Sequence, residues 1–192
     1  RHIVSSSGGK DSTAMLLKMI ENNMQIDDIV FCDTGVEFPE MYKHISQVQE
    51  HIKRPITVLK SKYTYEYLMF DYVKKKGKNK GKKGYSWPDF RNRWCTRCLK
   101  FDPIKQYLKQ YKNYEVVEYH GIALDEIHRT KKNKGRNIKY PLVKWKMTEK
   151  NCLEYCYKHG FNWSGLYEKF DRVSCYLCPL QLLGELKVIY KD

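Results

Sequence analysis

The segment IVSSSGGKDSTAML, residues 3 to 16, constrains the fold more than any other part of the sequence. It begins as an apolar strand, runs through three serines and two glycines, and becomes helical at about Asp11. In a parallel sheet, the loop that leaves a strand meets the free N–H groups of the next helix, and anionic ligands bind there. The segment therefore predicts an anion-binding strand, loop and helix near the start of an α/β domain.

The rest of the chain continues this alternation of strands and helices. Hydrophobic periodicity predicts strands over 2–6, 27–33, 56–61 and 115–123, and helices over 11–22, 38–51 and 101–111. A last segment, about 148 to 170, is helical with an aromatic break. Such an order predicts a Rossmann-like parallel sheet with helices on both faces.

The length bounds the number of domains. A chain of 192 residues, 42% of them hydrophobic, suffices for one compact domain with a real core. We therefore expect a single nucleotide-binding domain over 1–192, with a mobile basic loop at 74–84 and a helical, cysteine-clipped portion from about 146. The sequence has no apolar run of the roughly 18 residues that a membrane span needs, and no secretory signal pattern. A cytoplasmic location without membrane contact is expected.

The charge favours a polyanionic partner. The formal net charge is +14, from 36 Lys and Arg against 22 Asp and Glu, which favours a nucleotide, DNA or RNA. Seven lysines lie in KKKGKNKGKK, residues 74 to 83, which also reads as a solvated charge run. The next stretch, YSWPDFRNRW, interleaves aromatic and basic side chains as single-strand binding surfaces do, although core or lid packing is an equal interpretation.

The side chains of the first loop suit a phosphate ligand. Gly8 and Gly9 leave room for a close anion, while Ser7 and Ser12 offer hydroxyls and Lys10 a positive charge. An acid at Asp11 makes sense if it receives a metal ion such as Mg²⁺ or caps the helix. The adjacent glycines followed directly by lysine differ from the spacing of a P-loop.

A strand, S-G-G-K-D-S and a helix form the signature of the PP-loop. Here the sequence resembles the phosphoadenosine phosphosulfate (PAPS) reductase family of the PP-loop, or adenine nucleotide alpha-hydrolase, superfamily. Further matching pieces are FCDTGVEFPE, RWCTRCLKFDPI, GIALDEIHR, YPLVKW and RVSCYLCPLQ. The resemblance implies that the loop holds nucleotide phosphates or a sulfate through Ser7, Gly8, Gly9, Lys10, Asp11 and Ser12.

The same resemblance implies roles for residues beyond the loop. Asp33, Thr34 and Gly35 match positions beside the adenosine, although a plain turn would also explain them. Lys100 and Arg129 match basic positions that face the anion, and both act as candidate catalytic residues together with Lys10 and Asp11. Asp125 and Glu126 either orient Arg129 or bind a metal ion.

Two C-x-x-C clips, Cys95 with Cys98 and Cys175 with Cys178, supply four soft ligands that fit tetrahedral zinc or an iron–sulfur cluster. The resemblance favours a [4Fe-4S] cluster near the substrate anion, with zinc as the alternative. Cys152 and Cys156 share one helical face, and we expect them to pack in the core.

Three functions remain open. The favoured one is ATP-dependent adenylation with sulfur transfer to a nucleic acid or nucleotide, with Lys10 and Mg²⁺ balancing the charge of departing pyrophosphate. A cysteine desulfurase or similar sulfur-donor protein is then an expected partner. The second is reduction of an adenylylated sulfate, PAPS or APS, for which the sequence shows no cysteine nucleophile after Cys178. The third is a non-catalytic, metal-stapled module that binds nucleic acid.

Overall fold

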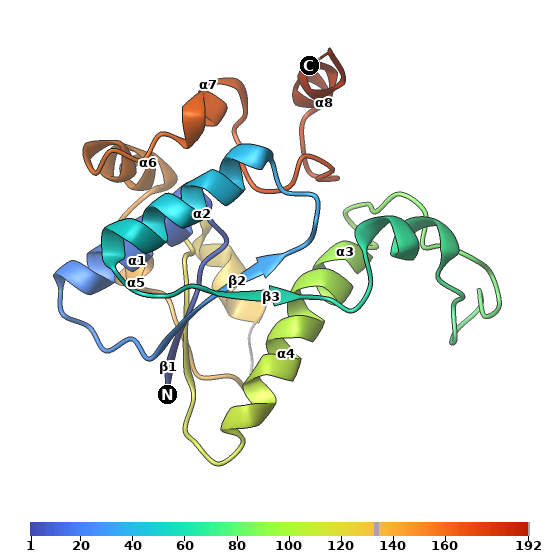
Figure 1. Ribbon diagram of the computed structural model, residues 1–192, viewed down its shortest axis with the longest axis horizontal. Coiled ribbons are helices and arrows are strands. Elements are labelled where there is room, and N and C mark those ends of the chain that lie inside the picture. Colours follow the sequence, from blue (N-terminus) through green and yellow to red (C-terminus); the bar gives the residue numbers. More distant parts are fainter. Residues whose placement is uncertain (133–134, 192) are drawn as a thin grey trace. The chain divides into compact units, whose positions relative to one another are not determined.

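A five-stranded sheet organises the chain in the computed structural model, which describes residues 1–132 and 135–191. The strands follow the spatial order β3-β2-β1-β4-β5, and β1 runs parallel to both of its neighbours. Figure 1 labels β1, β2 and β3. Their bounds are β1 (His2–Ser5), β2 (Asp28–Asp33), β3 (Thr57–Lys60), β4 (Val117–His120) and β5 (Ile138–Lys139). The sheet and its helices form an α/β Rossmann-like fold, which confirms the predicted fold class.

Helices α1, α2 and α4 lie close to the predicted ranges, α6, α7 and α8 lie in the predicted helical portion from about 146, and α3 and α5 lie outside the predicted ranges. The α-helices are α1 (Lys10–Glu21), α2 (Pro39–Ile52), α3 (Trp94–Thr96), α4 (Asp102–Leu108), α5 (Pro141–Lys144), α6 (Glu149–Lys158), α7 (Leu166–Lys169) and α8 (Leu183–Lys191). The π-helical turns are η1 (Tyr67–Asp71) and η2 (Arg97–Phe101), and the 3-10 turns are η3 (Lys109–Tyr111), η4 (Leu124–Lys132) and η5 (Trp163–Gly165).

The predicted break in the last helical segment begins at Gly160. This glycine has a φ of +82°, in the left-handed region, and its N–H donates to the carbonyl of Tyr157. Only glycine adopts this conformation without a steric penalty, so α6 ends at Lys158. The two-residue β5 lies outside the predicted ranges because it is too short for alternation to be visible.

The residue contacts divide the chain into two compact units. The first unit comprises Arg1–Phe31, Phe38–Val58 and Tyr111–Ser174, and the second comprises Cys32–Glu37, Leu59–Gln110 and the segment from Cys175 onward. The expected single domain over 1–192 stays a prediction.

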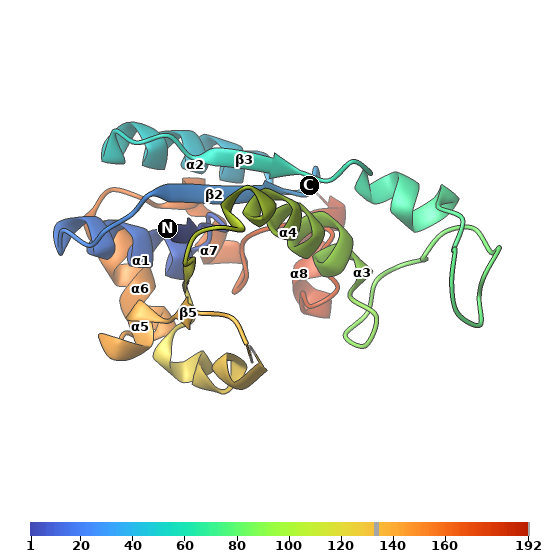
Figure 2. The ribbon, with the colours of Figure 1, turned by 90° about the horizontal axis from the view of Figure 1, so that it is seen from below.

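The first unit is built around α1. Its Met15, Leu16 and Met19 are fully buried. Both α5 and α6 lie beside α1, as Figures 1 and 2 show. Cys152 and Cys156 of α6 are also fully buried, which confirms that this pair packs in the core.

The second unit has an aromatic core of its own. Buried Tyr65, Leu68, Trp94 and Leu99 form its centre together with Val36. The lysine-rich loop, residues 74 to 83, folds back on itself, because the Lys74 N–H donates to Lys82 O at 3.0 Å and the Gly81 N–H to Lys74 O at 2.8 Å. The mobility expected for this loop stays a prediction.

None of the helices in the described ranges, 1–132 and 135–191, is both long enough and apolar enough to cross a bilayer.

Gly121 follows β4 and sits directly against the first turn of α1. A Cβ atom at this position would lie 2.8 Å from both the Cα and the N of Ser12, so the backbone of one element would have to move. We expect Gly121→Ala to lower the free energy of unfolding by roughly 1–3 kcal/mol in urea titrations. The control is Gly184→Ala in α8, where a Cβ meets open space and helix propensity predicts a gain of up to about 1 kcal/mol. Equal effects of the two substitutions would contradict this account.

Candidate nucleotide-binding site

The loop between β1 and α1 is folded back onto the first turn of its helix. The Ser12 hydroxyl accepts from the Ser7 N–H at 3.1 Å and donates to Gly9 O at 3.0 Å. Gly8 has a φ of +77°, and its carbonyl accepts a 2.7 Å hydrogen bond from Trp163 Nε1. Ser7 and Ser12 therefore hold the shape of the loop, and the two glycines permit it.

A tyrosine hydroxyl accepts a hydrogen bond from one of the backbone amides at the start of α1. The Lys10 N–H donates to Tyr167 Oη at 2.8 Å, and burial raises the pKa of Tyr167, so the phenol stays protonated. Gly9 also lies close to this hydroxyl, which a Cβ would approach to 3.3 Å. The Tyr167 oxygen thus sits where a phosphate oxygen would accept a hydrogen bond. No local sequence pattern indicates this role, because Tyr167 lies 157 residues from Lys10.

Lys10 is buried and already paired. Its Nζ lies 2.7 Å from a carboxylate oxygen of Glu149 and 5.3 Å from the ring centre of Tyr167, and the residue is only 9% exposed. The Glu149 N–H donates in turn to the Asp125 carboxylate at 3.2 Å. An incoming phosphate would therefore exchange with Glu149 as the partner of Lys10, and Asp125 keeps Glu149 in position.

Asp11 is an acid with an unpaired oxygen. Its Oδ1 is buried without a hydrogen-bond partner, and burial raises its pKa from 3.8 to about 6, with Glu149 and Glu126 adding to the rise and Lys10 opposing it. The N-cap of α1 is Gly9, which has no side-chain cap, so Asp11 does not cap the helix. Mg²⁺ is commonly held by one or two carboxylates together with substrate phosphates, and this orphaned oxygen fits such a ligand.

The basic candidate of the first unit is ion-paired. Arg129 in η4 contacts the Glu126 carboxylate, and its side chain is 45% exposed. Of the two hypotheses for the neighbouring acids, the structure favours orientation of Arg129 by Glu126, while Asp125 supports Glu149.

In the second unit, the residues predicted to lie beside the adenosine form a turn that is stabilised by its own side chains. The Asp33 carboxylate accepts from the Gly35 N–H at 2.8 Å and pairs with Lys60 Nζ at 3.0 Å. Thr34 donates through both its N–H and its hydroxyl to Glu37. These contacts explain the turn, and the role beside adenosine stays a prediction.

Lys100 also lies in the second unit, near acidic and thiol groups. Burial raises the pKa of Glu37, and the positive charge of Lys100 opposes that rise. Lys100 likewise opposes the rise in the pKa of Cys175, which a hydrogen bond with Cys178 and burial produce. The convergence of Lys100 with Arg129 on one anion stays a prediction.

The four clip cysteines carry thiols, and Cys95, Cys98 and Cys175 pack against the aromatic core of the second unit. Cys95, Cys175 and Cys178 lie near Tyr65, whose pKa is raised by burial and by these thiols, while Cys98 faces Tyr85 and Arg97. Four thiols in one unit match the donor chemistry of a soft metal or a cluster. Within residues 1–132 and 135–191, however, no three His, Cys, Asp or Glu side chains are arranged to hold a metal ion.

Asp11 makes stability depend on pH. Burial raises the pKa of Asp11 in the folded state above its value in the unfolded chain. The stability that protonation of Asp11 contributes is therefore fully present below about pH 4 and is lost as the pH rises through about 6. Asp11→Asn should therefore be more stable than the wild type above pH 6, by up to about 3 kcal/mol, and should lose this advantage near pH 4. Urea unfolding at both pH values, without Mg²⁺ or nucleotide, measures the difference. An advantage that is the same at both pH values would contradict the assignment.

Solved structures with a similar fold include a phosphoadenylyl-sulfate (PAPS) reductase from Candida auris in its phosphate complex. It is 15% identical, with a TM-score of 0.60, over 92% of this chain and 82% of that chain, and it shows the fold. The U34-tRNA thiolase NcsA from Methanococcus maripaludis, solved with its [4Fe-4S] cluster, aligns over 99% of this chain and 64% of that chain. Its 13% identity and TM-score of 0.49 are too low to carry an argument.

Relatives among curated proteins cover the chain from end to end. Two uncharacterized proteins of Methanocaldococcus jannaschii are 28% identical over 200 residues and 30% identical over 202 residues, which is 99% and 98% of this chain. The chain spans only 38% and 44% of their lengths. The phosphoadenosine phosphosulfate reductase domain matches residues 1–181. The chain therefore belongs to the PAPS reductase domain family of PP-loop proteins.

Proposed function

We propose that this protein is an enzyme that binds an adenine nucleotide at its PP-loop and uses ATP to adenylate an acceptor for sulfur transfer. The observation that carries the proposal is the orphaned Asp11 Oδ1 beside Lys10 at the start of α1. Burying an acid without a partner costs stability, and a metal ion held between this carboxylate and a phosphate would remove that cost. The acceptor in this proposal is a nucleic acid or a nucleotide.

The residues of the first unit suit the adenylation step. An acceptor oxygen attacks the α-phosphorus, the bond from that phosphorus to the oxygen bridging the β-phosphorus breaks, and pyrophosphate leaves. When Lys10 Nζ exchanges its partner Glu149 for the phosphates, its positive charge offsets the negative charge that develops on the leaving group. The Lys10 N–H, which donates to Tyr167 Oη in the absence of ligand, then donates to the same phosphate oxygens. Arg129, oriented by Glu126, is proposed as a further anion ligand, as is Lys100 of the second unit.

Sulfur then replaces the activated oxygen. A hydrosulfide, released from a donor persulfide by a thiol reductant, attacks the adenylated centre, and AMP departs with the oxygen as the new bond to sulfur forms. We propose that a sulfur-donor protein such as a cysteine desulfurase supplies this sulfur. Cys95, Cys98, Cys175 and Cys178 are proposed to hold a [4Fe-4S] cluster, or zinc as the alternative. The four thiolates would provide one ligand for each iron of such a cluster.

Reduction of an adenylylated sulfate is the second candidate, and the family to which the chain belongs favours it. It differs in its products, because the reductase reaction releases sulfite from PAPS and no pyrophosphate. A binding module without catalysis would show neither product and no affinity for ATP. Assays of pyrophosphate exchange and sulfite release on one preparation therefore separate the three functions.

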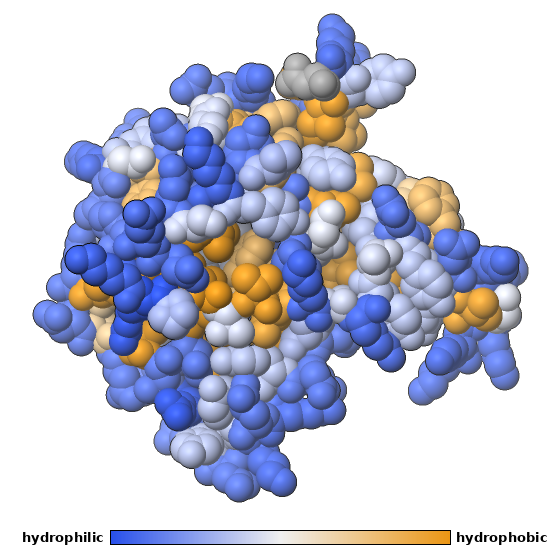
Figure 3. Space-filling model, viewed as in Figure 1, coloured by the Kyte–Doolittle hydropathy of each residue, from blue (hydrophilic) through white to orange (hydrophobic). Residues whose placement is uncertain are grey.

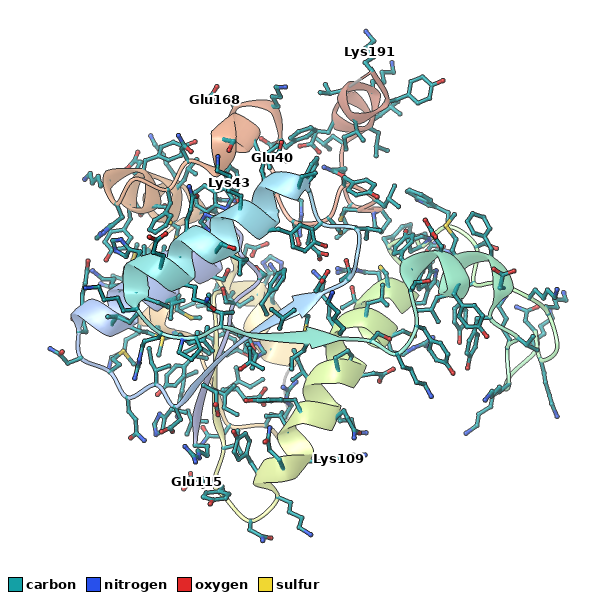
Figure 4. All side chains as sticks on the ribbon, viewed as in Figure 1. Glu40, Lys43, Lys109, Glu115, Glu168 and Lys191 are labelled. Atoms are coloured by element: carbon teal, nitrogen blue, oxygen red, sulfur yellow. The ribbon has the colours of Figure 1, made fainter. Side chains whose placement is uncertain are left out.

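Replacing the loop lysine tests nucleotide binding. Lys10→Ala should weaken ATP binding about 10- to 150-fold, because it removes a charge-assisted contact of about 1.5–3 kcal/mol, and should abolish pyrophosphate exchange. Isothermal titration and labelled pyrophosphate measure the two effects. The matched control is Lys43→Ala, the same change on the exposed side of α2 (Figure 4). Unchanged ATP affinity in Lys10→Ala would remove the basis of both enzymatic functions.

The cysteine clips are tested by metal content. After anaerobic purification we expect a brown protein with about four irons, and Cys175→Ser should lose colour and iron. Cys152→Ala, which replaces a fully buried thiol of the first unit, should retain both. Colourless protein with zinc would select the alternative metal, and metal-free protein that folds normally would contradict a metal site.

A further inference from the structure

The second unit contains a basic groove that the PP-loop chemistry does not use. Its volume is about 1120 Å³, and its walls come from the end of β3, η1, the lysine-rich loop, η2 and the start of α4. Six exposed or half-buried cations line it in addition to Lys60, namely Lys62, Lys74, Lys75, Lys76, Lys78 and Arg97. Lys60 pairs with Asp33, and Asp102 is the acid among the lining residues. The lining therefore carries a strong positive charge.

A column of stacked rings leads from the core of the second unit to this groove. Trp94 is fully buried and stacks on Tyr85 at 5.8 Å, and Tyr85 stacks on Tyr72 at 5.1 Å with an interplanar angle of 20°. Tyr63 meets Tyr72 edge-on at 5.5 Å. Tyr63, Tyr72 and Tyr85 all line the groove. Because neighbouring rings fix them in place, little conformational freedom remains to be lost when a ligand stacks on them.

Three of the cations lie close to the rings. Lys62 Nζ lies 4.8 Å from the ring centre of Tyr63, and Lys74 Nζ and the Arg97 guanidinium lie 5.7 and 5.6 Å from that of Tyr85. Figure 3 shows hydrophilic side chains gathered around the segment that carries η1 and the lysine-rich loop, at the right of the view. Positive charge beside aromatic faces matches the alternation of phosphates and bases in a single strand.

The backbone holds the lysine-rich loop against η1. Gly84, at the end of the loop, has a φ of +60°, and a Cβ there would lie 2.3 Å from Met69 O. Its N–H donates to Tyr72 O, and the next N–H, of Tyr85, donates to Leu68 O, each at 2.9 Å. These contacts fix where the loop returns. Lys74, Lys75, Lys76 and Lys78 line the groove, whereas Lys80, Lys82 and Lys83 of the same loop do not.

We infer that this groove binds single-stranded nucleic acid, with phosphates on the lysines and Arg97 and with bases stacked on Tyr63 and Tyr72. Paired bases keep their faces inside a duplex, so the rings select an unpaired strand. Cys98, a proposed metal ligand, lines the same groove, which places a bound strand near the proposed sulfur chemistry. The strand's role as sulfur acceptor rests on the proposed function, whereas its binding needs no nucleotide.

Fluorescence anisotropy without ATP tests the inference. The probes are a labelled oligouridylate of about 12 nucleotides, a deoxythymidylate and a duplex of the same length, and a polyglutamate peptide. Both single strands should bind at least about tenfold more tightly than the duplex and the peptide, with affinity falling as salt rises. Tighter binding of the peptide would assign the groove to an acidic protein partner, and equal binding of the duplex would contradict base stacking.

Matched variants locate the binding. A triple change of Lys75, Lys76 and Lys78 to Gln should weaken single-strand binding roughly 10- to 100-fold and lower the salt slope by about 2, at about 0.7 per phosphate. The control changes Lys80, Lys82 and Lys83 to Gln in the same loop, with the same loss of charge and a smaller effect expected. Equal losses in both triples would show diffuse attraction to a charged loop and would overturn the inference.

The tyrosines are tested separately from charge. Tyr63→Leu should weaken single-strand binding about tenfold with an unchanged salt slope, since stacking involves no counterion. Tyr190→Leu, at a side chain that is 92% exposed on α8, should bind as the wild type does. Lys10→Ala should also bind the strand normally. In the wild-type protein, strand binding without ATP binding would refute the proposed enzyme and keep the groove, whereas ATP binding without strand binding would refute the groove alone.

Discussion

The ion pair between Lys10 and Glu149 is the interaction on which the candidate site depends. It brings together residues 139 positions apart in the sequence, and it places a buried ammonium at the start of α1 at a distance of 2.7 Å from its partner. A buried lysine without a partner would be strongly destabilising, so the site is formed before any ligand arrives. The same pair affects the proposed binding of phosphate. A phosphate would have to replace Glu149 as the partner of Lys10 Nζ and Tyr167 as the acceptor of the Lys10 N–H.

This arrangement couples the stability of the protein to its ligand. Asp11 lies next to Lys10, and burial raises the pKa of its carboxyl group. Its Oδ1 has no hydrogen-bond partner, and a divalent cation would provide one. Beneath it, Cys156 donates to Lys10 O at 3.4 Å, and Gly121 allows close packing of the strand end. An unpaired buried polar atom at one loop is typical of a functional site that gains stability on binding.

The sequence predicted much of this fold and less of the site. Four of the five strands and the start of α1 follow from hydrophobic periodicity, which is a local signal, and the fold class follows from their order. The loop residues and the four cysteines were predicted from their own motifs, and the family resemblance added Asp33, Thr34, Gly35, Lys100 and Arg129 as candidates. Tyr167, Glu149 and Trp163 could not be predicted in the same way, because their roles arise from long-range contacts with residues 8 to 10. The groove could not be predicted for a related reason. The stretch YSWPDFRNRW shows aromatic and basic residues interleaved, but the stacking of Tyr85 on Trp94 and Tyr72 arises only in the folded chain.

The central claim is that the PP-loop receives nucleotide phosphates, and a crystal structure of the protein soaked with Mg²⁺ and a non-hydrolysable ATP analogue tests it most directly. The account predicts a phosphate oxygen on the Lys10 N–H in place of the Tyr167 hydroxyl, with Lys10 Nζ on the phosphates and the metal ion on Asp11 Oδ1. A structure in which the nucleotide binds elsewhere, while Tyr167 and Glu149 keep their contacts with Lys10, would contradict it.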